Sequence, residues 1–95
     1  MSSKQLFLET KAENFKNYIN GFSPSDSVKS YIEGFNNDQL IPTIVAKLVP
    51  VATMGGFDSV AEKFINELVI PEGQKAIVKN KIIAYMDMFV NLVLS

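Results

Sequence analysis

The sequence contains no cysteine, histidine, tryptophan or arginine, so all nine of its basic residues are lysines. Without cysteine the chain has neither a disulfide framework nor a thiolate nucleophile. Without cysteine and histidine it also lacks the side chains that build most zinc and transition-metal sites. We therefore expect no metal, no cofactor and no catalytic residue, and we rank an enzyme last among the possible functions.

The missing arginine and the balanced charge argue against nucleic-acid binding. Arginine is the side chain that reads guanine edges and holds phosphate with two parallel hydrogen bonds. The formal net charge is −1, so the whole molecule exerts little attraction on an anionic polymer or on an anionic membrane surface. We predict no sequence-specific nucleic-acid binding, and an accessory role in nucleic-acid binding ranks low.

Long hydrophobic runs are also missing. Near the start, only the three apolar residues at 6–8 stand in a row before charges resume, so the apolar region of a secretory signal is absent. The longest uncharged run of the middle region, residues 48–57, is far shorter than the roughly 20 residues that a spanning helix needs. We expect no transmembrane segment, and an intracellular, cytoplasmic protein.

What the chain does contain is typical of one small globular domain. Apolar residues make up 47% of its 95 positions and aromatic residues 11%, more than a disordered chain carries. A chain of this length buries only about 60–65% of its unfolded surface, so its core is thin. We predict a single helical domain over residues 1–95.

The first helix is predicted from a narrow apolar stripe at three- and four-residue spacing. It ends near Gly21. The residues of the stripe are Leu8, Ala12, Phe15, Ile19 and Phe22.

A second helix is predicted after the segment Ser-Pro-Ser-Asp. Ser23 can cap it, Pro24 suits its first position, and the charge of Asp26 favours its N-terminus. Gly34 and the asparagines at 36–37 mark its end. Its shared apolar face consists of Val28, Tyr31, Ile32 and Phe35.

Residues 38–54 contain two prolines that complicate the pattern. A turn at 38–41 is expected to lead into a short helix that ends before Pro50, because proline lacks the N–H that a helix interior uses, and Pro42 is awkward for the same reason. The β-branched run at 43–45 leaves a strand open as an alternative. The pattern also leaves open whether this segment forms one helix or two.

The pair Gly55-Gly56 breaks the chain before a further helix that begins at Phe57 or Asp58. Pro71 and Gly73 then make a tight connection to the last helix. The inner face of the helix between these breaks consists of Val60, Ala61, Phe64, Ile65 and Leu68.

The last helix, from about 74 to 94, is apolar around more than half of its circumference. A helix of this kind is normally central, so we predict an all-α fold, a compact bundle of four or five short helices around this longer one. Its polar seam is Asn80, Ala84, Asp87 and Asn91.

The other helices are too short to cover all of this apolar surface. Ile77, Met88 and Leu94 lie at its flanks without an evident partner in the chain. A second copy would bury such a face on both subunits at once, so we expect a homo-oligomer, most simply a homodimer, or a helical protein partner.

Several polar groups could carry chemistry, but each also has a structural interpretation. Gly55-Gly56 before a helix resembles a phosphate cradle only weakly, and a turn is favoured. The carboxylate pairs Glu9 with Glu13 and Glu62 with Glu67 are expected to be solvated. Asp87 lies on the polar seam but has apolar neighbours, so one hypothesis is that Lys81 or an asparagine amide holds it.

Two further clusters remain as hypotheses. Lys75, Lys79 and Lys81, beside Asn80, oppose the helix dipole, which suggests either a phosphate-binding patch or a nearby acidic partner. The methionines Met54, Met86 and Met88, with the seven phenylalanines, could line an adaptable groove, although core packing explains them more simply.

The sequence therefore predicts a non-enzymatic protein-protein interaction or assembly module that self-associates through its C-terminal helix. The alternative is a small helical carrier of an apolar ligand or acyl chain, with phenylalanine and methionine lining its cavity.

Overall fold

The computed structural model describes residues 3–95, and all regular secondary structure in them is helical. The predicted all-α fold is confirmed, and the strand alternative at 43–45 is wrong. The elements in chain order are α1 (Ser3–Asn20), α2 (Asp26–Glu33), α3 (Leu40–Thr43), the π-helix η1 (Ile44–Leu48), α4 (Val49–Thr53), α5 (Asp58–Asn66), the 3₁₀-helix η2 (Glu72–Gln74) and α6 (Lys75–Leu94).

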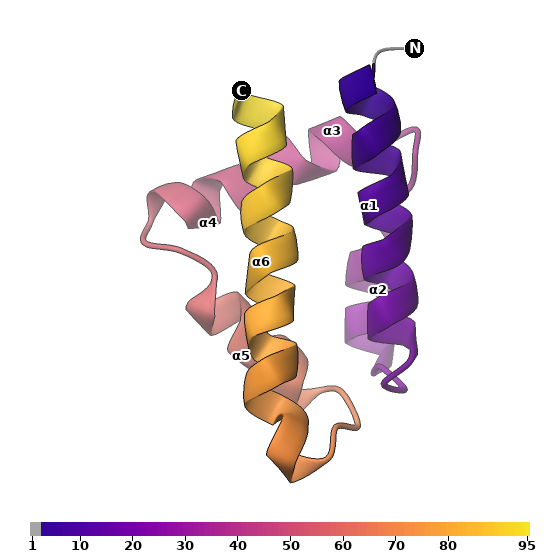
Figure 1. The fold of residues 1–95 in the computed structure, drawn as a ribbon, viewed down its shortest axis with the longest axis vertical. Coiled ribbons are helices and arrows are strands. Elements are labelled where there is room, and N and C mark those ends of the chain that lie inside the picture. Colours follow the sequence, from indigo (N-terminus) through magenta and orange to yellow (C-terminus); the bar gives the residue numbers. More distant parts are fainter. Residues whose placement is uncertain (1–2) are drawn as a thin grey trace.

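Helix α6 is the central element of the bundle, as its composition predicts. It contacts α1, α5, η1, α4 and η2. In Figure 1, α1 and α6 run side by side, and the segment from α3 to α4 crosses behind α6. The Lys4 ammonium donates to the backbone carbonyl of Ser95 at 2.7 Å, which holds the start of α1 beside the end of α6.

The predicted stripe of α1 forms the middle of the core. Leu8, Ala12, Phe15 and Ile19 are fully buried. Phe15 is the hub of an aromatic cluster, since its ring centroid lies 5.6 Å from that of Phe35 and 5.7 Å from that of Phe89, both edge to face. Edge-to-face rings at this distance add to the stability that burial provides.

The start of α2 differs from the prediction. The cap is Ser25, whose hydroxyl accepts a hydrogen bond from the Val28 N–H at 3.2 Å. Ser23 instead adopts a left-handed backbone, with φ of 51°, so that the chain turns at 23–25 before α2 begins at Asp26. The aspartate does lie in the first turn, where its charge favours the helix dipole.

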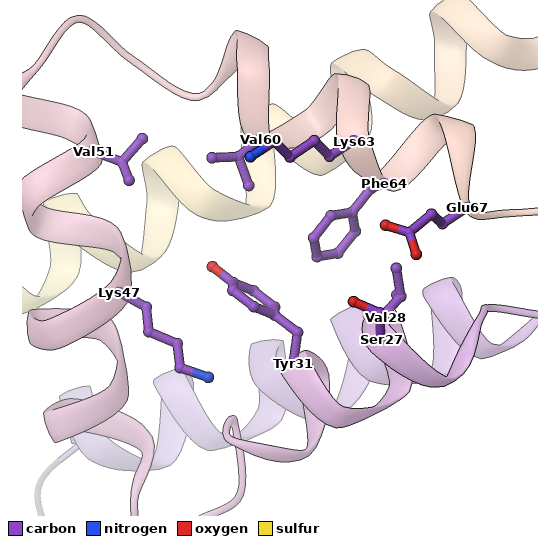
Figure 2. Close-up of a pocket in the computed structure, with 9 residues that line it drawn as sticks. All are labelled: Ser27, Val28, Tyr31, Lys47, Val51, Val60, Lys63, Phe64 and Glu67. Carbon is purple, nitrogen blue, oxygen red and sulfur yellow. The ribbon is translucent and has the colours of Figure 1, made fainter.

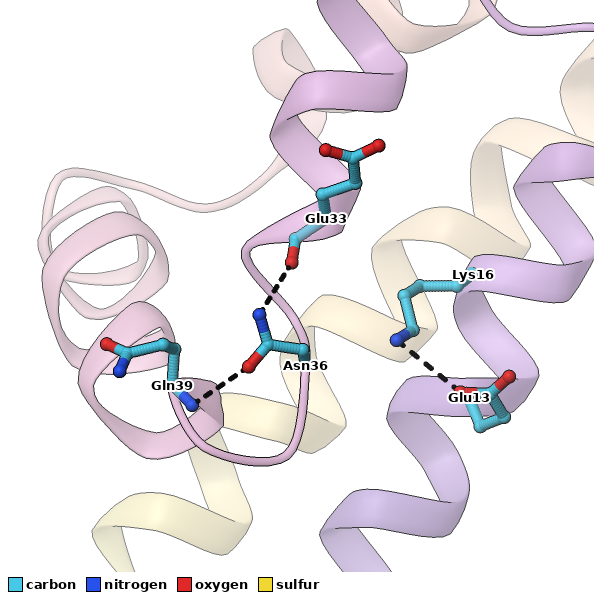
Figure 3. A network of polar contacts seen from close by, with 5 residues as sticks. All are labelled: Glu13, Lys16, Glu33, Asn36 and Gln39. Atoms are coloured by element: carbon cyan, nitrogen blue, oxygen red, sulfur yellow. Dashed lines mark hydrogen bonds and ion pairs between the residues drawn. The ribbon is translucent and has the colours of Figure 1, made fainter.

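A single asparagine organises the connection from α2 to α3. The Asn36 amide donates to the Glu33 carbonyl at 3.1 Å, and its oxygen accepts from the Gln39 N–H at 3.2 Å, as Figure 3 shows. The same figure shows Lys16 paired with Glu13 on the neighbouring α1, at 3.4 Å. Asn36 therefore satisfies backbone groups at the end of one helix and at the start of the next.

The prediction that a helix ends before Pro50 is wrong, because the chain stays helical without a gap from Leu40 to Thr53. Just before Pro50 the helix widens into the π-helix η1, in which the Val49 N–H donates to the Ile44 carbonyl, five residues back. This wider turn absorbs the missing N–H and the bulk of the proline ring. Pro42 is tolerated because it lies in the first turn, where N–H groups have no intrahelical partner.

The glycine pair ends this helical segment as expected. Gly55 and Gly56 have φ of +124° and +115°, a region that residues with a side chain rarely adopt. Helix α5 then begins at Asp58, and its predicted inner residues Ala61, Phe64 and Ile65 are buried.

The faces of α6 follow the predicted division. Its buried residues are Val78, Ile82, Met86, Phe89 and Val90. The predicted polar seam is exposed. Ile77 and Leu94 are each 65% exposed, so the expected surplus of apolar surface on this helix is present at both of its ends.

Within residues 3–95, no single helix combines the length and the apolar composition of a membrane span. Among these residues, the segments Leu40–Thr53 and Asp58–Asn66 reach the length and apolar composition of a span when they are taken together, but their axes meet at 116°.

Candidate functional site

The lysines at the start of α6 do not form one patch, because each has a different neighbour. Lys79 lies between two carboxylates of α5, 2.9 Å from Glu62 and 3.1 Å from Asp58. Hydrogen bonds to Glu62 and then to Asp58 raise the pKa of Lys79. The acidic partner that the helix dipole suggested is therefore supplied by the chain itself.

The two other lysines of that cluster point elsewhere. Lys75 pairs with Glu72 of η2 at 2.8 Å. The Lys81 ammonium lies over the ring of Tyr18 of α1, 4.5 Å from its centroid. This cation–π contact lies at the edge of the interface between α1 and α6. The hypothesis of a phosphate-binding patch on these lysines is not supported.

The predicted carboxylate pairs are also separated by their contacts. Glu13 pairs with Lys16 and Glu62 with Lys79, whereas Glu67 accepts a hydrogen bond from the Ser25 hydroxyl at 2.7 Å. Glu9 accepts from the Gln5 amide at 3.5 Å. Within residues 3–95, no three acidic side chains converge in a way that could hold a metal ion.

The hypothesis that Lys81 holds Asp87 is wrong. Asp87 is exposed, and Lys81 contacts Tyr18 instead. Asp87 belongs to the outward side of α6, which we call the outer strip. The outer strip consists of Ile77, Asn80, Ala84, Asp87, Asn91 and Leu94, all of them exposed.

The outer strip has a regular spacing. Ile77, Ala84 and Asn91 stand at every seventh position, and Asn80, Asp87 and Leu94 repeat at the same interval three residues later. Such positions lie along one side of a helix, as the a and d positions of a coiled coil do, but only Ile77 and Leu94 in this strip are large apolar residues. The strip therefore has the geometry by which one helix packs along another, although its middle is polar.

A shallow hollow of about 230 Å³ borders the outer strip on the side of α1. It is lined by Lys11, Lys81, Ala84, Tyr85 and Met88. The Lys11 ammonium lies 5.2 Å from the centroid of the Phe7 ring. Beside this hollow, at the interface between α1 and α6, burial and then the neighbouring Tyr85 raise the pKa of Tyr18.

A larger cleft of about 390 Å³ lies between α2, the η1–α4 segment and α5 (Figure 2). Its volume is within the range of about 300–1,000 Å³ that is usual for ligand sites. The residues that line it are Ser27, Val28, Tyr31, Lys47, Val51, Val60, Lys63, Phe64 and Glu67.

Tyr31 is the central side chain of this cleft. Its ring packs edge to face on Phe64, with centroids 5.3 Å apart, and the Lys47 ammonium lies 4.6 Å from its centroid. Burial raises the pKa of Tyr31, so the hydroxyl keeps its proton at neutral pH and can donate a hydrogen bond. In Figure 2 this hydroxyl points into the space between Val51 and Val60.

Comparisons with protein-family models, with curated proteins and with solved structures found no match to this chain.

The methionine groove of the sequence hypothesis does not form. Met86 is fully buried in the core, whereas Met54 lies in the loop after α4 and is 87% exposed. Met88 is half-buried beside the outer strip. Three buried phenylalanines, Phe15, Phe35 and Phe89, contact one another in the core, whereas Phe64 packs on Phe15 and also lines the cleft around Tyr31.

Sequence reasoning missed the cleft. The sequence pattern places Tyr31 on the apolar face of α2, and it gives no signal for Lys47 and Lys63, because exposed lysines are common on helices. Only the packing of three helices brings these residues to one hollow. A tyrosine in place of an aliphatic residue on an inner face is the one hint, since a buried tyrosine normally keeps its hydroxyl near a polar or solvent-filled space.

Proposed function

We propose that this protein is a non-enzymatic interaction and assembly module that self-associates through the outer strip of α6. The observation that carries the proposal is the exposure of two large apolar side chains, Ile77 and Leu94, at the two ends of one side of α6. A second copy of α6 would cover both of these side chains, and two-fold pairing buries the same face on each subunit.

The order of residues along the outer strip favours antiparallel pairing. In an antiparallel pair of helices, each residue at heptad position a of one helix forms a layer with a residue at heptad position d of the other. Ile77 then faces the partner's Leu94 at both ends of the interface, and Asn80 faces the partner's Asn91. Each asparagine amide has both donors and an acceptor, so this layer satisfies itself.

Parallel pairing would be less favourable. It would place Asp87 opposite the partner's Asp87, and like charges in direct contact are destabilising. In the antiparallel pair, Asp87 instead lies opposite the partner's Ala84. The small alanine side chain in this central layer also lets the two helices approach closely. Packed helices have interaxial distances of about 8–10 Å.

The proposed dimer is weak, because its middle layers are polar and only its end layers bury large apolar side chains. Polar residues in the layers between two paired helices fix the register and orientation of the pair, and they lower its stability. We expect dimers to be populated above roughly 100 μM protein, which is typical of small, transient interfaces.

The rival function, a carrier of an apolar ligand or acyl chain, has less support. A carrier would need its phenylalanines to line a chamber, whereas Phe15, Phe35 and Phe89 fill the core by contacting one another. An intracellular location is part of the main proposal, and the absence of cysteine fits a reducing compartment.

Sedimentation equilibrium from about 10 μM to 1 mM tests the proposal. We expect the apparent mass to rise towards that of a dimer with concentration. The variant Ala84→Glu, which places a carboxylate opposite the partner's Asp87, should remain monomeric. The matched variant Asn17→Glu, on the exposed side of α1, should behave like the unaltered protein. A mass that stays monomeric throughout would remove the proposal.

A further inference from the structure

The cleft between α2, the η1–α4 segment and α5 takes no part in the proposed self-association. In Figure 2, α6 runs behind the side chains that line the cleft. The core thus separates the cleft from the outer strip, and an interaction in one leaves the other accessible. A role for the cleft must therefore be argued from its own walls and polar groups.

The walls of the cleft are apolar on all three sides. Val28 comes from α2, Val51 from α4, and Val60 and Phe64 from α5. The face of Tyr31 completes this lining, since its ring packs against Phe64. Such walls exclude water from an aromatic or branched aliphatic group that enters the cleft, and this burial favours binding.

Three donor groups at the cleft, those of Tyr31, Lys47 and Lys63, have no acceptor from the described part of the protein. Across residues 3–95, neither the Tyr31 hydroxyl nor the Lys63 ammonium has a hydrogen-bond or ion-pair partner. The Lys47 ammonium lies over the Tyr31 ring, 4.6 Å from its centroid, and has no hydrogen-bond or ion-pair partner within residues 3–95. Figure 2 shows Lys63 extending over Val60 towards the space into which the Tyr31 hydroxyl points.

The one carboxylate at the cleft is already engaged. Glu67 accepts from the Ser25 hydroxyl at 2.7 Å, and in Figure 2 it lies at the end of the cleft away from Lys47. The end near Lys47 and Lys63 is thus positively charged, and it offers ammonium and hydroxyl donors to a negatively charged group. Charge complementarity and the apolar walls together define the occupant.

We propose that this cleft binds a small organic monocarboxylate with an apolar body, such as an aryl-alkanoate. The body lies between Val51, Val60 and Phe64, and the carboxylate receives hydrogen bonds from the Tyr31 hydroxyl and the lysine ammonium groups. Glu67 repels further negative charge at the opposite end, which favours one carboxylate over a ligand with two.

Titration of ¹⁵N-labelled protein with 3-phenylpropionate tests this proposal. We expect saturable shifts of the amide signals of Tyr31, Lys47, Val51, Val60 and Lys63, with a dissociation constant of about 1 mM or tighter. The neutral analogue 3-phenylpropanamide should bind at least about threefold more weakly, because it lacks the charge that the ammonium groups attract.

Variants separate the cleft from general electrostatic attraction. Tyr31→Phe and Lys63→Met should each weaken binding by about three- to tenfold. Lys29→Met removes the same charge from the exposed side of α2, outside the cleft, and should leave the affinity unchanged. The circular dichroism of each variant confirms that it has folded.

Three results would overturn the proposal: no saturable shifts at the cleft residues up to about 10 mM ligand, equal affinity for the acid and the amide, or equal weakening by Lys29→Met and Lys63→Met. The Ala84→Glu variant should bind 3-phenylpropionate normally, so a failure of self-association and a failure of ligand binding are distinguishable.

Discussion

The Ser25 hydroxyl donates to the Glu67 carboxylate at 2.7 Å, across 42 residues of sequence. The Ser25 N–H also donates to the Glu67 backbone carbonyl at 3.1 Å. The same hydroxyl accepts from the Val28 N–H as the cap of α2. One serine thus joins the start of α2 to the end of α5, and with it closes one end of the cleft.

Ser25→Ala should lower the free energy of unfolding by about 1–2 kcal/mol, because it removes the helix cap and the bond to Glu67 together. Glu67→Gln keeps a side-chain acceptor and should cost less than half as much. Urea denaturation of both variants measures the difference. Equal losses for the two variants would mean that the cap contributes little.

Gly56→Ala should lower the free energy of unfolding by about 1–3 kcal/mol through backbone strain alone. Its φ is +115°, and no atom lies within 4 Å of an added Cβ. Gly73→Ala provides the matched control, since Gly73 has the same open surroundings without a positive φ. If thermal unfolding shows equal effects for the two substitutions, the strain argument fails.

Alkaline pH should destabilise the protein through Lys79, Tyr31 and Tyr18. The pKa of each is raised in the folded state, Lys79 by its carboxylate partners and the two tyrosines chiefly by burial. The folded protein therefore holds these protons more tightly than the unfolded chain. The stability that this provides is present below their ordinary pKa values of about 10 and is lost as pH rises above them.

Comparison of urea midpoints at about pH 9 and pH 11 measures this loss. Lys79→Met and Tyr31→Phe should each show a smaller drop in midpoint between the two pH values than the unaltered protein. Lys29→Met, on an exposed lysine, should show the full drop. A drop that neither Lys79→Met nor Tyr31→Phe reduces would contradict the assigned causes.

Much of the fold could be predicted from the sequence because its helices have clear apolar faces. Leu8, Ala12, Phe15 and Ile19 recur at helical spacing, and all four are fully buried. The surplus of apolar surface on α6 was likewise visible in Ile77 and Leu94, which the remaining chain is too short to cover. Periodicity predicts such features because burial, the strongest favourable term in folding, decides them.

Features that depend on local backbone geometry or on packing were not predictable in this way. Ser23 and Ser25 are equally good caps by type, and only the turn at 23–25 selects the second. A proline usually ends a helix, but the π-helix η1 accommodates Pro50 in this chain. The cleft around Tyr31 joins residues from three helices, and its lysines have no sequence pattern that distinguishes them from other exposed lysines.

The outer strip of α6 combines the predicted polar seam with Ile77 and Leu94, two of the apolar residues that the sequence predicts to lack a partner in the chain. Ile77 and Leu94 lie about 25 Å apart along the helix, at about 1.5 Å per residue. In the proposed antiparallel dimer, Ile77 is close to the partner's Leu94 and distant from the partner's Ile77.

Disulfide exchange tests this arrangement most directly, because the chain has no cysteine of its own. Equal amounts of ¹⁵N-labelled Ile77→Cys protein and unlabelled Leu94→Cys protein are mixed in a glutathione redox buffer, and the label distinguishes the mixed disulfide from the two homodimers by mass. We predict that the mixed disulfide between the two variants dominates over either homodimer. Homodimers of Ile77→Cys in excess would indicate parallel pairing, and an absence of cross-linked protein would contradict self-association through α6.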